Sequence, residues 1–213
     1  MGRSRNDHGR CAACWVQVEH CFCAELHSGP VGLRLAIVRH YKEQWKTSNT
    51  ARVVAATCDG ASVHDWHGRG TPFEGPDLGG ASFLLYPDAE LGPADVPDGA
   101  TVVVVDGAWK QVGKMVRFAP GLARLPRVSV PVSEAASPLL RRRVRTGGVS
   151  SAEAIAALLA ARGEETSAAR LRAGLKAQAS AILASKGLSH ATRNDQLRTS
   201  TRGEGVATPS NDG

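Results

Sequence analysis

Short apolar runs separated by polar segments recur along the first 132 residues of the chain. The clearest is residues 102–105, four consecutive valines, which is typical of a strand buried on both faces of a sheet. Residues 31–38 and 82–86 are comparable runs, and Pro87 stops the second. The sequence therefore predicts three core strands, with further strands at residues 127–132 and near residues 61–64.

Helical patterns alternate with these runs. We expect helices at residues 42–56, 109–118, 151–162 and 164–184. Strands that alternate with helices predict an α/β fold, with a mostly parallel sheet and helices on both of its faces. The chain lacks a G-x-G-x-x-G after its first predicted strand and lacks any G-x-x-x-x-G-K-[ST]. These absences argue against an ordinary dinucleotide-binding fold and against a P-loop NTPase.

Asp106 follows the valine run directly, and Gly107 after it allows a sharp backbone turn. In open α/β sheets, ligands bind beyond the carboxyl ends of the strands. Asp106 is therefore a candidate functional acid. The competing interpretation is that Asp106 only caps the helix that begins at Trp109.

Four cysteines lie within thirteen positions near the start of the chain. They form two close pairs, Cys11-Ala-Ala-Cys14 and Cys21-Phe-Cys23. Two such pairs are the usual way to place four thiolates tetrahedrally around a structural zinc ion. The alternatives are two disulfides or a redox-active CxxC. Disulfides need an oxidising compartment, and residues 1–10 are polar and basic without the apolar run of a signal peptide.

The net charge of +6 favours an anionic partner, of which nucleic acid is the commonest. The competing interpretation is that this charge serves only solubility. A dense arginine cluster repels itself unless it faces water or phosphates, and such a cluster is formed by Arg141, Arg142, Arg143 and Arg145. No stretch approaches the roughly 18 apolar residues of a membrane span. We therefore expect a cytoplasmic protein with no membrane partner.

Composition divides the 213 residues into four parts. Residues 1–10 are predicted to be disordered, and residues 11–24 form the zinc knuckle. Residues 25–184 form the α/β domain, which includes Gly-, Asp- and Pro-rich loops at 59–80 and 88–100. Residues 185–213 are polar and are predicted to be a disordered tail.

Several separated segments together carry a family resemblance. These are the four cysteines, Arg39-His40 with residues 46–52, Leu85-Tyr86-Pro87, Asp106-Gly-Ala-Trp109 with the following Lys110, Gln111, Lys114 and Met115, and Ser137 with Arg142 and residues 150–154. In this order they resemble the DTW domain proteins, which are tRNA-uridine aminocarboxypropyltransferases related to the SPOUT superfamily. The resemblance runs from about residue 11 to residue 162. It implies a SPOUT-like α/β fold and leaves open whether the chain is knotted.

The chain departs from the family pattern at three positions. The threonine of the Asp-x-Thr-Trp signature is Ala108, the usual tyrosine between the serine and the arginine is Leu139, and the threonine before Glu153 is Ser151. The loss of the hydroxyl at Ala108 removes a hydrogen bond to ligand or backbone. Ser151 keeps a hydroxyl.

The resemblance implies transfer of the 3-amino-3-carboxypropyl group of S-adenosylmethionine to N3 of a tRNA uridine, with methylthioadenosine leaving. The enzyme must align the γ-carbon, instead of the methyl group, with the attacking nitrogen. N3 carries a proton and is a poor nucleophile until that proton is removed, which a buried carboxylate can do. Asp106 is the predicted catalytic base.

The resemblance also implies the residues that hold S-adenosylmethionine. Arg52 or Arg142 would bind its carboxylate, and Ser48, Asn49 and Thr50 its ammonium group or ribose. The competing roles are solvation for Arg52 and helix capping for Ser48 and Asn49. The full set expected to contact the cofactor is Ser48, Asn49, Thr50, Arg52, Leu85, Tyr86, Pro87, Gly107, Trp109, Arg142, Ser151 and Glu153.

Leu85, Tyr86 and Pro87 would line the adenine pocket, or simply end a core strand in a turn. Trp109 would stack on a base or on adenine. Its competing role is to pack the helix onto the sheet.

RNA binding is expected to be electrostatic first, with phosphate contacts from Lys110, Lys114, Arg141, Arg143 and Arg145. Three other functions remain open at this point. They are a SPOUT-type RNA methyltransferase that uses the same cofactor, a non-catalytic zinc-containing RNA-binding protein, and the same transfer to rRNA.

Overall fold

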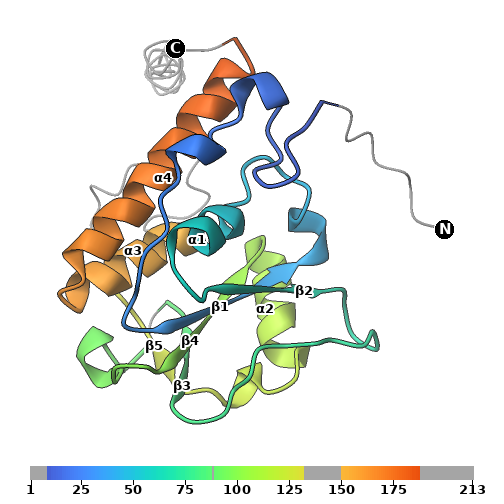
Figure 1. The fold of residues 1–213 in the computed structure, drawn as a ribbon. Helices are drawn as coiled ribbons and strands as arrows, with labels where there is room; N and C mark the ends of the chain where they lie inside the picture. Colours follow the sequence, from blue (N-terminus) through green and yellow to red (C-terminus); the bar gives the residue numbers. More distant parts are fainter. Residues whose placement is uncertain (1–8, 88, 132–149, 188–213) are drawn as a thin grey trace, which may run out of the picture.

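The structure, a computed structural model, describes residues 9–87, 89–131 and 150–187. Within these residues, five parallel strands form one sheet in the order β2-β1-β4-β3-β5 (Figure 1). The α/β class and the parallel sheet predicted from the sequence are confirmed. The strands are β1 (Arg34–His40), β2 (Ser62–Trp66), β3 (Ser82–Leu85), β4 (Thr101–Asp106) and β5 (Arg127–Val128).

In the described part of the chain, four α-helices cover this sheet: α1 (Ala51–Thr57), α2 (Trp109–Phe118), α3 (Ser151–Ala161) and α4 (Glu165–Ala184). Single 3₁₀ turns lie at Val18–His20, Cys23–Glu25, Tyr41–Glu43, Pro93–Asp95 and Leu122–Arg124. None of the described helices combines the length and apolar character that crossing a lipid bilayer requires.

The valines of β4 build both halves of the core because successive side chains of a strand point to opposite faces. Val102 and Val104 pack in the larger apolar cluster, which contains the buried residues of α1, α3 and α4. Val103 and Val105 pack in the second cluster, against the buried side of α2. Every residue of β4 is buried, as the unbroken valine run predicts.

The chain leaves the neighbouring strands β1 and β4 toward opposite faces of the sheet. After β1 the chain forms α1 on one face and returns as β2 on one side of β1. After β4 it forms α2 on the other face and reaches β5 beyond β3. Adjacent strands whose connections diverge in this way leave a crevice at their carboxyl ends, where ligands of open α/β sheets bind. Asp106 ends β4 at this point, and Arg39 is its register partner on β1.

The predicted helix at residues 42–56 is wrong in its first two thirds. A 3₁₀ turn at Tyr41–Glu43 is followed by an irregular loop, and α1 begins only at Ala51. Gln178 of α4 donates hydrogen bonds from Nε2 to the backbone carbonyls of Thr47 and Asn49, both at 2.9 Å. A contact across about 130 residues of sequence fixes this loop, and local propensity carries no information about it.

Smaller differences concern strand ends. The first strand begins three residues later than predicted, at Arg34, and ends two residues later, at His40, and β5 is only two residues long. The strand predicted near residues 61–64 extends to Trp66. Gly9 and Arg10, from the segment predicted to be disordered, pair with residues 17–18 of the cysteine-rich loop.

The helix α2 begins at an N-cap, Ala108, which has no side-chain acceptor for the free N–H groups of the first turn. Gln111 satisfies one half of a capping box, because its Oε1 accepts the N–H of Ala108 at 2.7 Å. Asp106 lies two residues before the cap, which excludes its predicted alternative role as the cap of this helix.

We therefore predict that Ala108→Thr stabilises the protein. A threonine hydroxyl at the N-cap would accept a first-turn N–H, which is worth about 1 kcal/mol of unfolding free energy and raises Tm by roughly 2–4 °C. Thermal unfolding followed by circular dichroism checks this. Ala173→Thr, at an exposed position within α4, is the control and should lower Tm slightly. An unchanged or lower Tm for Ala108→Thr contradicts the prediction.

Candidate active site

The carboxylate of Asp106 lies buried at the carboxyl end of β4, with the residue 4% exposed. Its Oδ2 accepts a hydrogen bond from Asn49 Nδ2 at 2.5 Å, and its Oδ1 accepts one from Ser151 Oγ at 3.0 Å. These partners come from the loop before α1 and from the first turn of α3. Three of the predicted site residues, far apart in the sequence, therefore meet at the carboxyl end of β4, beside β1.

Asn49 is held on three sides. Its backbone carbonyl accepts Gln178 Nε2, and its side-chain Oδ1 accepts Arg39 Nη1 at 3.2 Å. Its Nδ2 donates to Asp106. Asn49 does not cap α1, as its alternative role would require, because Thr50 is the N-cap of that helix.

Arg39 also forms a two-pronged ion pair with Asp65 at the end of β2. Nε donates to Oδ1 at 2.7 Å and Nη2 to Oδ2 at 2.9 Å. A planar guanidinium matches a carboxylate in this way, and the two parallel bonds fix its direction. Arg39 stood out in the sequence only as part of the family motif, and no local motif identifies Asp65 or Gln178 as site residues.

Ser151 owes its position to the start of α3. Ser150 is the N-cap, and its hydroxyl accepts the N–H of Glu153 at 3.2 Å. The Glu153 carboxylate accepts the N–H of Ser150 at 2.7 Å, which completes a capping box. Glu153, predicted to contact the cofactor, thus fixes the turn that presents Ser151 to Asp106.

Gly107 and Trp109 lie at the mouth of this site. A Cβ on Gly107 would lie 3.2 Å from Gln111 Oε1, a close contact with the end of a flexible side chain, and 3.5 Å from His40 Cβ, an ordinary contact. Trp109 is 41% exposed, whereas α2 packs on the sheet through Val112 and its buried neighbours. Trp109 therefore keeps surface that a ligand can reach, and Val112, Met115 and Val116 are the buried residues of α2.

The strand β3 ends next to β4, and the three residues at its end have different environments. Leu85 is buried in the larger core cluster. Tyr86 is half-buried, with the Arg127 guanidinium 4.8 Å from its ring centre, and Pro87 is exposed. Leu85 therefore fits the core-strand interpretation, and only Tyr86 and Pro87 have surface left for a ligand.

Arg52, on the first turn of α1, faces the cysteine-rich loop. It donates to the carbonyl of Gln44, and its guanidinium lies 5.6 Å from the ring centre of Trp15. Burial lowers its pKa, and the nearby charge of Arg39 adds to this effect. Its Nη1 is buried and has no hydrogen-bond partner among the described residues. Thr50 is buried beside it, and Ser48 is half-buried in the preceding loop.

His40, beside Arg39 at the end of β1, is nearly buried. Its Nδ1 accepts the N–H of Lys42 at 3.2 Å, and its ring stacks on Tyr41 and meets the edge of Trp66. Burial lowers its pKa, so that the neutral ring is favoured. These contacts give His40 a structural role.

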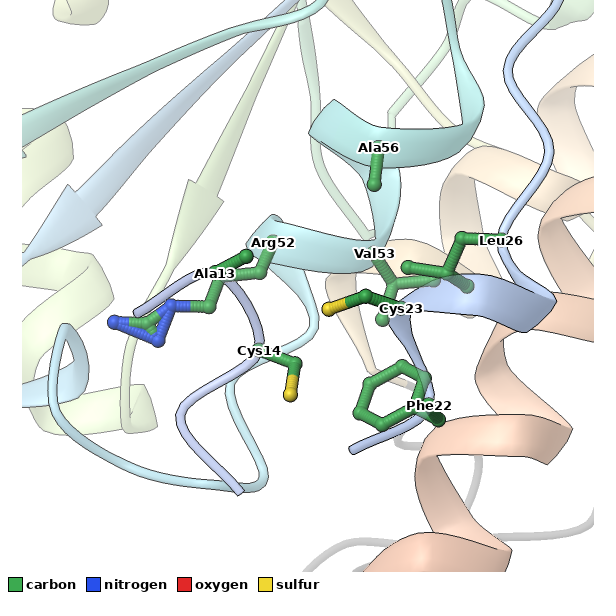
Figure 2. Close-up of a pocket in the computed structure, with 8 residues that line it drawn as sticks. All are labelled: Ala13, Cys14, Phe22, Cys23, Leu26, Arg52, Val53 and Ala56. Atoms are coloured by element: carbon green, nitrogen blue, oxygen red, sulfur yellow. The ribbon is translucent and has the colours of Figure 1, made fainter. Parts of the chain in front are cut away.

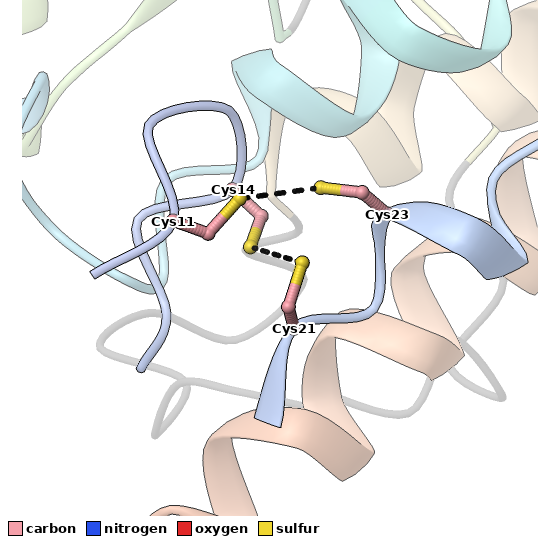
Figure 3. Close-up of side chains that lie close together, drawn as sticks. All are labelled: Cys11, Cys14, Cys21 and Cys23. Carbon is pink, nitrogen blue, oxygen red and sulfur yellow. Dashed lines mark hydrogen bonds between the residues drawn. The ribbon is translucent and has the colours of Figure 1, made fainter. Parts of the chain in front are cut away.

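The four N-terminal cysteines converge as predicted (Figure 3). Their sulfur atoms all lie within 4.8 Å of one another, and two pairs, Cys11–Cys23 and Cys14–Cys21, are 3.8 Å apart. A disulfide requires about 2.05 Å, and all four thiols are free. Four sulfurs at about 2.3 Å from a tetrahedral metal ion lie about 3.8 Å apart. The cluster can therefore hold a metal ion.

The loop that carries Cys11 and Cys14 holds its shape through backbone hydrogen bonds and one strained residue. The N–H of Trp15 donates to the carbonyl of Cys11 at 2.9 Å, and Trp15 has a left-handed φ of 63°. That conformation costs roughly 1–2 kcal/mol for a residue with a side chain. The indole packs at 4.5 Å from Trp45 and against Arg52, which offsets the strain.

The thiols differ in acidity because their environments differ. The backbone N–H of Cys14 lowers the pKa of Cys11 to about 6, whereas burial raises the pKa of Cys14 and of Cys23. A bound metal ion would favour the thiolate form of all four.

A small cavity of about 190 Å³ lies between the cysteine-rich loop and α1 (Figure 2). The sulfur atoms of Cys14 and Cys23 border it together with Phe22 and Val53, while the Arg52 guanidinium extends away from Phe22. The lining is mostly apolar. This cavity lies where the cysteine module, the segment that carries the four N-terminal cysteines, packs on α1. Asp106 does not line it.

Two of the predicted RNA contacts, Lys110 and Lys114, are exposed on α2. Arg141, Arg142, Arg143 and Arg145 lie outside the described residues, as do Ser137 and Leu139.

Comparison with known proteins agrees with the sequence motifs. A protein of Drosophila melanogaster named tRNA-uridine aminocarboxypropyltransferase 2 is 24% identical over 172 residues, which cover 73% of this chain and 67% of that protein. No solved structure matches the chain. The relation to SPOUT proteins and a knot in the chain therefore stay predictions. The model of the DTW domain matches residues 8–183, a span that contains the cysteine cluster and the whole Asp106 site, and the chain belongs to the DTW domain family.

Proposed function

We propose that this protein is a tRNA-uridine aminocarboxypropyltransferase. S-adenosylmethionine would supply the 3-amino-3-carboxypropyl group, N3 of a tRNA uridine would receive it, and methylthioadenosine would leave. The observation that carries the proposal is the convergence of Asp106, Asn49 and Ser151 at the carboxyl end of β4. Membership of the DTW domain family and the name of the Drosophila relative support it.

In this proposal Asp106 takes the proton from N3 of the uridine. The two hydrogen bonds from Asn49 and Ser151 hold the carboxylate in one orientation. A base held in place by its neighbours loses little entropy in the reaction, and positioning is a large part of catalysis. In this proposal Asn49 and Ser151 orient the catalytic base, in addition to their predicted contacts with the cofactor.

The buried Nη1 of Arg52 supports a role for this residue in binding the cofactor. A buried guanidinium nitrogen with no partner among the described residues is costly unless a ligand satisfies it, and a carboxylate suits it best. Arg52 would thus hold the carboxylate of the methionine part, with Arg142 as the second candidate. Ser48 and Thr50 flank Asn49 and would complete the contacts to the ribose or ammonium group.

Tyr86 and Pro87 would contact the adenine, since they end the strand next to β4 and keep exposed surface. Trp109, exposed at the start of α2, would stack on the target uridine or on adenine. Gly107 would allow the ligand to approach the backbone closely.

The exposed side of α2 supports binding of RNA. Lys110, Lys114 and Arg117 lie four and three residues apart, which places them on one side of the helix. α2 contains no acidic residue, and no acid among the described residues forms an ion pair with these three cations. Their row begins next to the Asp106 site and would lead the phosphate backbone to it.

The metal of the cysteine cluster would be zinc in a structural role. Four sulfur ligands and no further donor are typical of structural zinc sites. Arg52 and Trp15 connect this module to the loop that carries Asn49. Zinc would therefore stabilise the site without contact to the reacting atoms.

We predict that Asp106→Asn abolishes transfer without unfolding the protein. The asparagine oxygen can still accept from Asn49, and Ser151 can turn its hydroxyl to accept the new N–H, so the packing survives while the base is lost. The purified protein would be incubated with S-adenosylmethionine and unmodified tRNA, and the digested nucleosides and released by-product measured by mass spectrometry. We expect aminocarboxypropyluridine and methylthioadenosine from the wild type, and a rate at least about 100-fold lower from the variant.

Other outcomes of this assay would redirect the proposal. A methylated nucleoside with S-adenosylhomocysteine would identify a methyltransferase. Modification of rRNA alone would change the substrate. No modification despite bound cofactor would favour a non-catalytic RNA-binding protein, and wild-type turnover by Asp106→Asn would remove Asp106 as the base.

We predict that Lys110→Ala and Lys114→Ala each weaken tRNA binding. Each loss of a phosphate contact should reduce the slope of log Kd against log salt concentration by about 0.7–0.9. Fluorescence anisotropy at several salt concentrations measures this slope. Lys176→Ala, an exposed lysine of α4 on the other face of the sheet, is the matched control. Equal slopes for all three variants and the wild type would show that α2 does not contact the phosphates.

We predict about one zinc ion per wild-type chain and its loss in Cys21→Ser, because a structural site needs all four sulfur ligands. Elemental analysis measures the metal, and thermal unfolding should give a lower Tm for the variant or for protein treated with a chelator. Cys58→Ala removes the one cysteine outside the cluster and should keep the zinc. Full zinc content in Cys21→Ser would contradict the assignment of this ligand.

A further inference from the structure

We propose that Arg39 and Asp65 are positioning residues that fix the Asn49 amide in the orientation that Asp106 requires. In this proposal neither residue contacts the substrates directly. They act through Asn49, along a line of hydrogen bonds that crosses the sheet from β2 through β1 to the end of β4. The catalytic part of this inference rests on the proposed function, and the part that concerns Asn49 does not.

The hydrogen bonds of the Asn49 amide depend on which way the amide is turned. One end of the amide donates two hydrogen bonds and the other end accepts. If Asn49 turned over, its oxygen would face the Asp106 carboxylate, an acceptor against an acceptor. In the observed orientation Nδ2 lies 2.5 Å from Asp106 Oδ2, and Oδ1 receives Arg39 Nη1 at 3.2 Å. Arg39, which has no acceptor, therefore selects the orientation that Asp106 needs.

The guanidinium of Arg39 has an aspartate on each side of it in the sheet. In the register of the sheet, Arg39 has Asp65 on one side and Asp106 on the other. The two-pronged pair with Asp65, at 2.7 and 2.9 Å, turns Nε and Nη2 toward β2 and leaves Nη1 for Asn49. A direct ion pair between Arg39 and Asp106 would instead tie up the carboxylate that is proposed to accept a proton. Asp65 thus keeps Arg39 directed away from the base.

The ion pair between Arg39 and Asp65 is largely buried. The Arg39 side chain is only 11% exposed and the Asp65 side chain 30%. A surface ion pair would reorient freely, whereas a nearly buried guanidinium must keep its partners because an unpaired buried charge is costly. The orientation of the Arg39 guanidinium is therefore fixed in the folded protein.

The chain contains a matched control for a buried arginine clamp. The Arg162 side chain is 9% exposed, donates to the carbonyl of Val96 and pairs with Asp98 at 2.5 Å. It lies at the amino ends of the strands, at the edge of the sheet opposite to Asp106. Its replacement should cost stability in the same way and leave the site untouched.

The test compares Arg39→Lys, Asp65→Asn and Arg162→Lys with the wild type. Lysine keeps the charge but cannot bond Asp65 with two prongs and Asn49 at once. We expect Arg39→Lys and Asp65→Asn to lower kcat by about 10- to 100-fold, the size of effect that a small misplacement of a catalytic group produces. KM for S-adenosylmethionine should stay unchanged. Arg162→Lys should lower Tm by a similar amount and keep wild-type kcat.

A second readout does not depend on turnover. The side-chain amide protons of Asn49, assigned by their loss in Asn49→Ser, should be shifted downfield and protected from exchange in the wild type by NMR. Arg39→Lys should lose this shift and protection, and Arg162→Lys should retain both.

The outcomes separate this inference from the proposed function. If the wild type has no transfer activity, the proposed function fails, and the Asn49 amide signals alone decide the inference. An unchanged Asn49 signal in Arg39→Lys overturns the inference. Wild-type kcat in both Arg39→Lys and Asp65→Asn, or an equal loss of kcat in Arg162→Lys, also overturns it.

Discussion

The buried carboxylate of Asp106 sets the requirement around which the site is organised. A carboxylate that leaves water without hydrogen-bond partners costs several kcal/mol, so its neighbours must donate to it. The chain meets this requirement with Asn49 and Ser151, from segments about 57 and 45 residues away. Each donor in turn needs support, which Arg39, Gln178 and the capping box of α3 provide.

This requirement connects parts of the molecule that would otherwise be independent. α4 reaches across to the loop before α1 through Gln178, and that loop meets the cysteine module through Trp45 and Arg52. The module is therefore more than an appendage, because its packing bears on the same loop that carries Asn49. The inference that a metal ion in the module supports the site follows from this continuity.

Ala108 illustrates how the structure changes the meaning of a sequence difference. From the sequence, the missing hydroxyl could have concerned either a ligand or the backbone. In the fold, residue 108 is the N-cap of α2, and Gln111 supplies only part of the missing capping. The departure from the family signature thus concerns the start of the helix, while Asp106 and its hydrogen bonds remain intact.

The parallel sheet and the cysteine cluster were predictable because their signals are local. Four valines in a row favour a strand covered on both faces, and two close cysteine pairs bring four sulfurs together over a short loop. The helix predicted at residues 42–56 failed for the opposite reason, since Gln178 fixes the loop from far along the chain. The sequence identified Trp109 as a candidate site residue but did not settle its role, because exposure to solvent is a property of the folded surface.

The sequence by itself determined the α/β class, the cysteine cluster and the place of Asp106 at the end of its strand, because periodicity and spacing act over a few residues. Only the tertiary structure decided that β1 and β4 lie side by side and diverge to opposite faces. That arrangement brings Asn49, Ser151 and the Arg39–Asp65 pair to one carboxylate. Strand order and long-range hydrogen bonds depend on the packing of the whole chain, and no local pattern contains them.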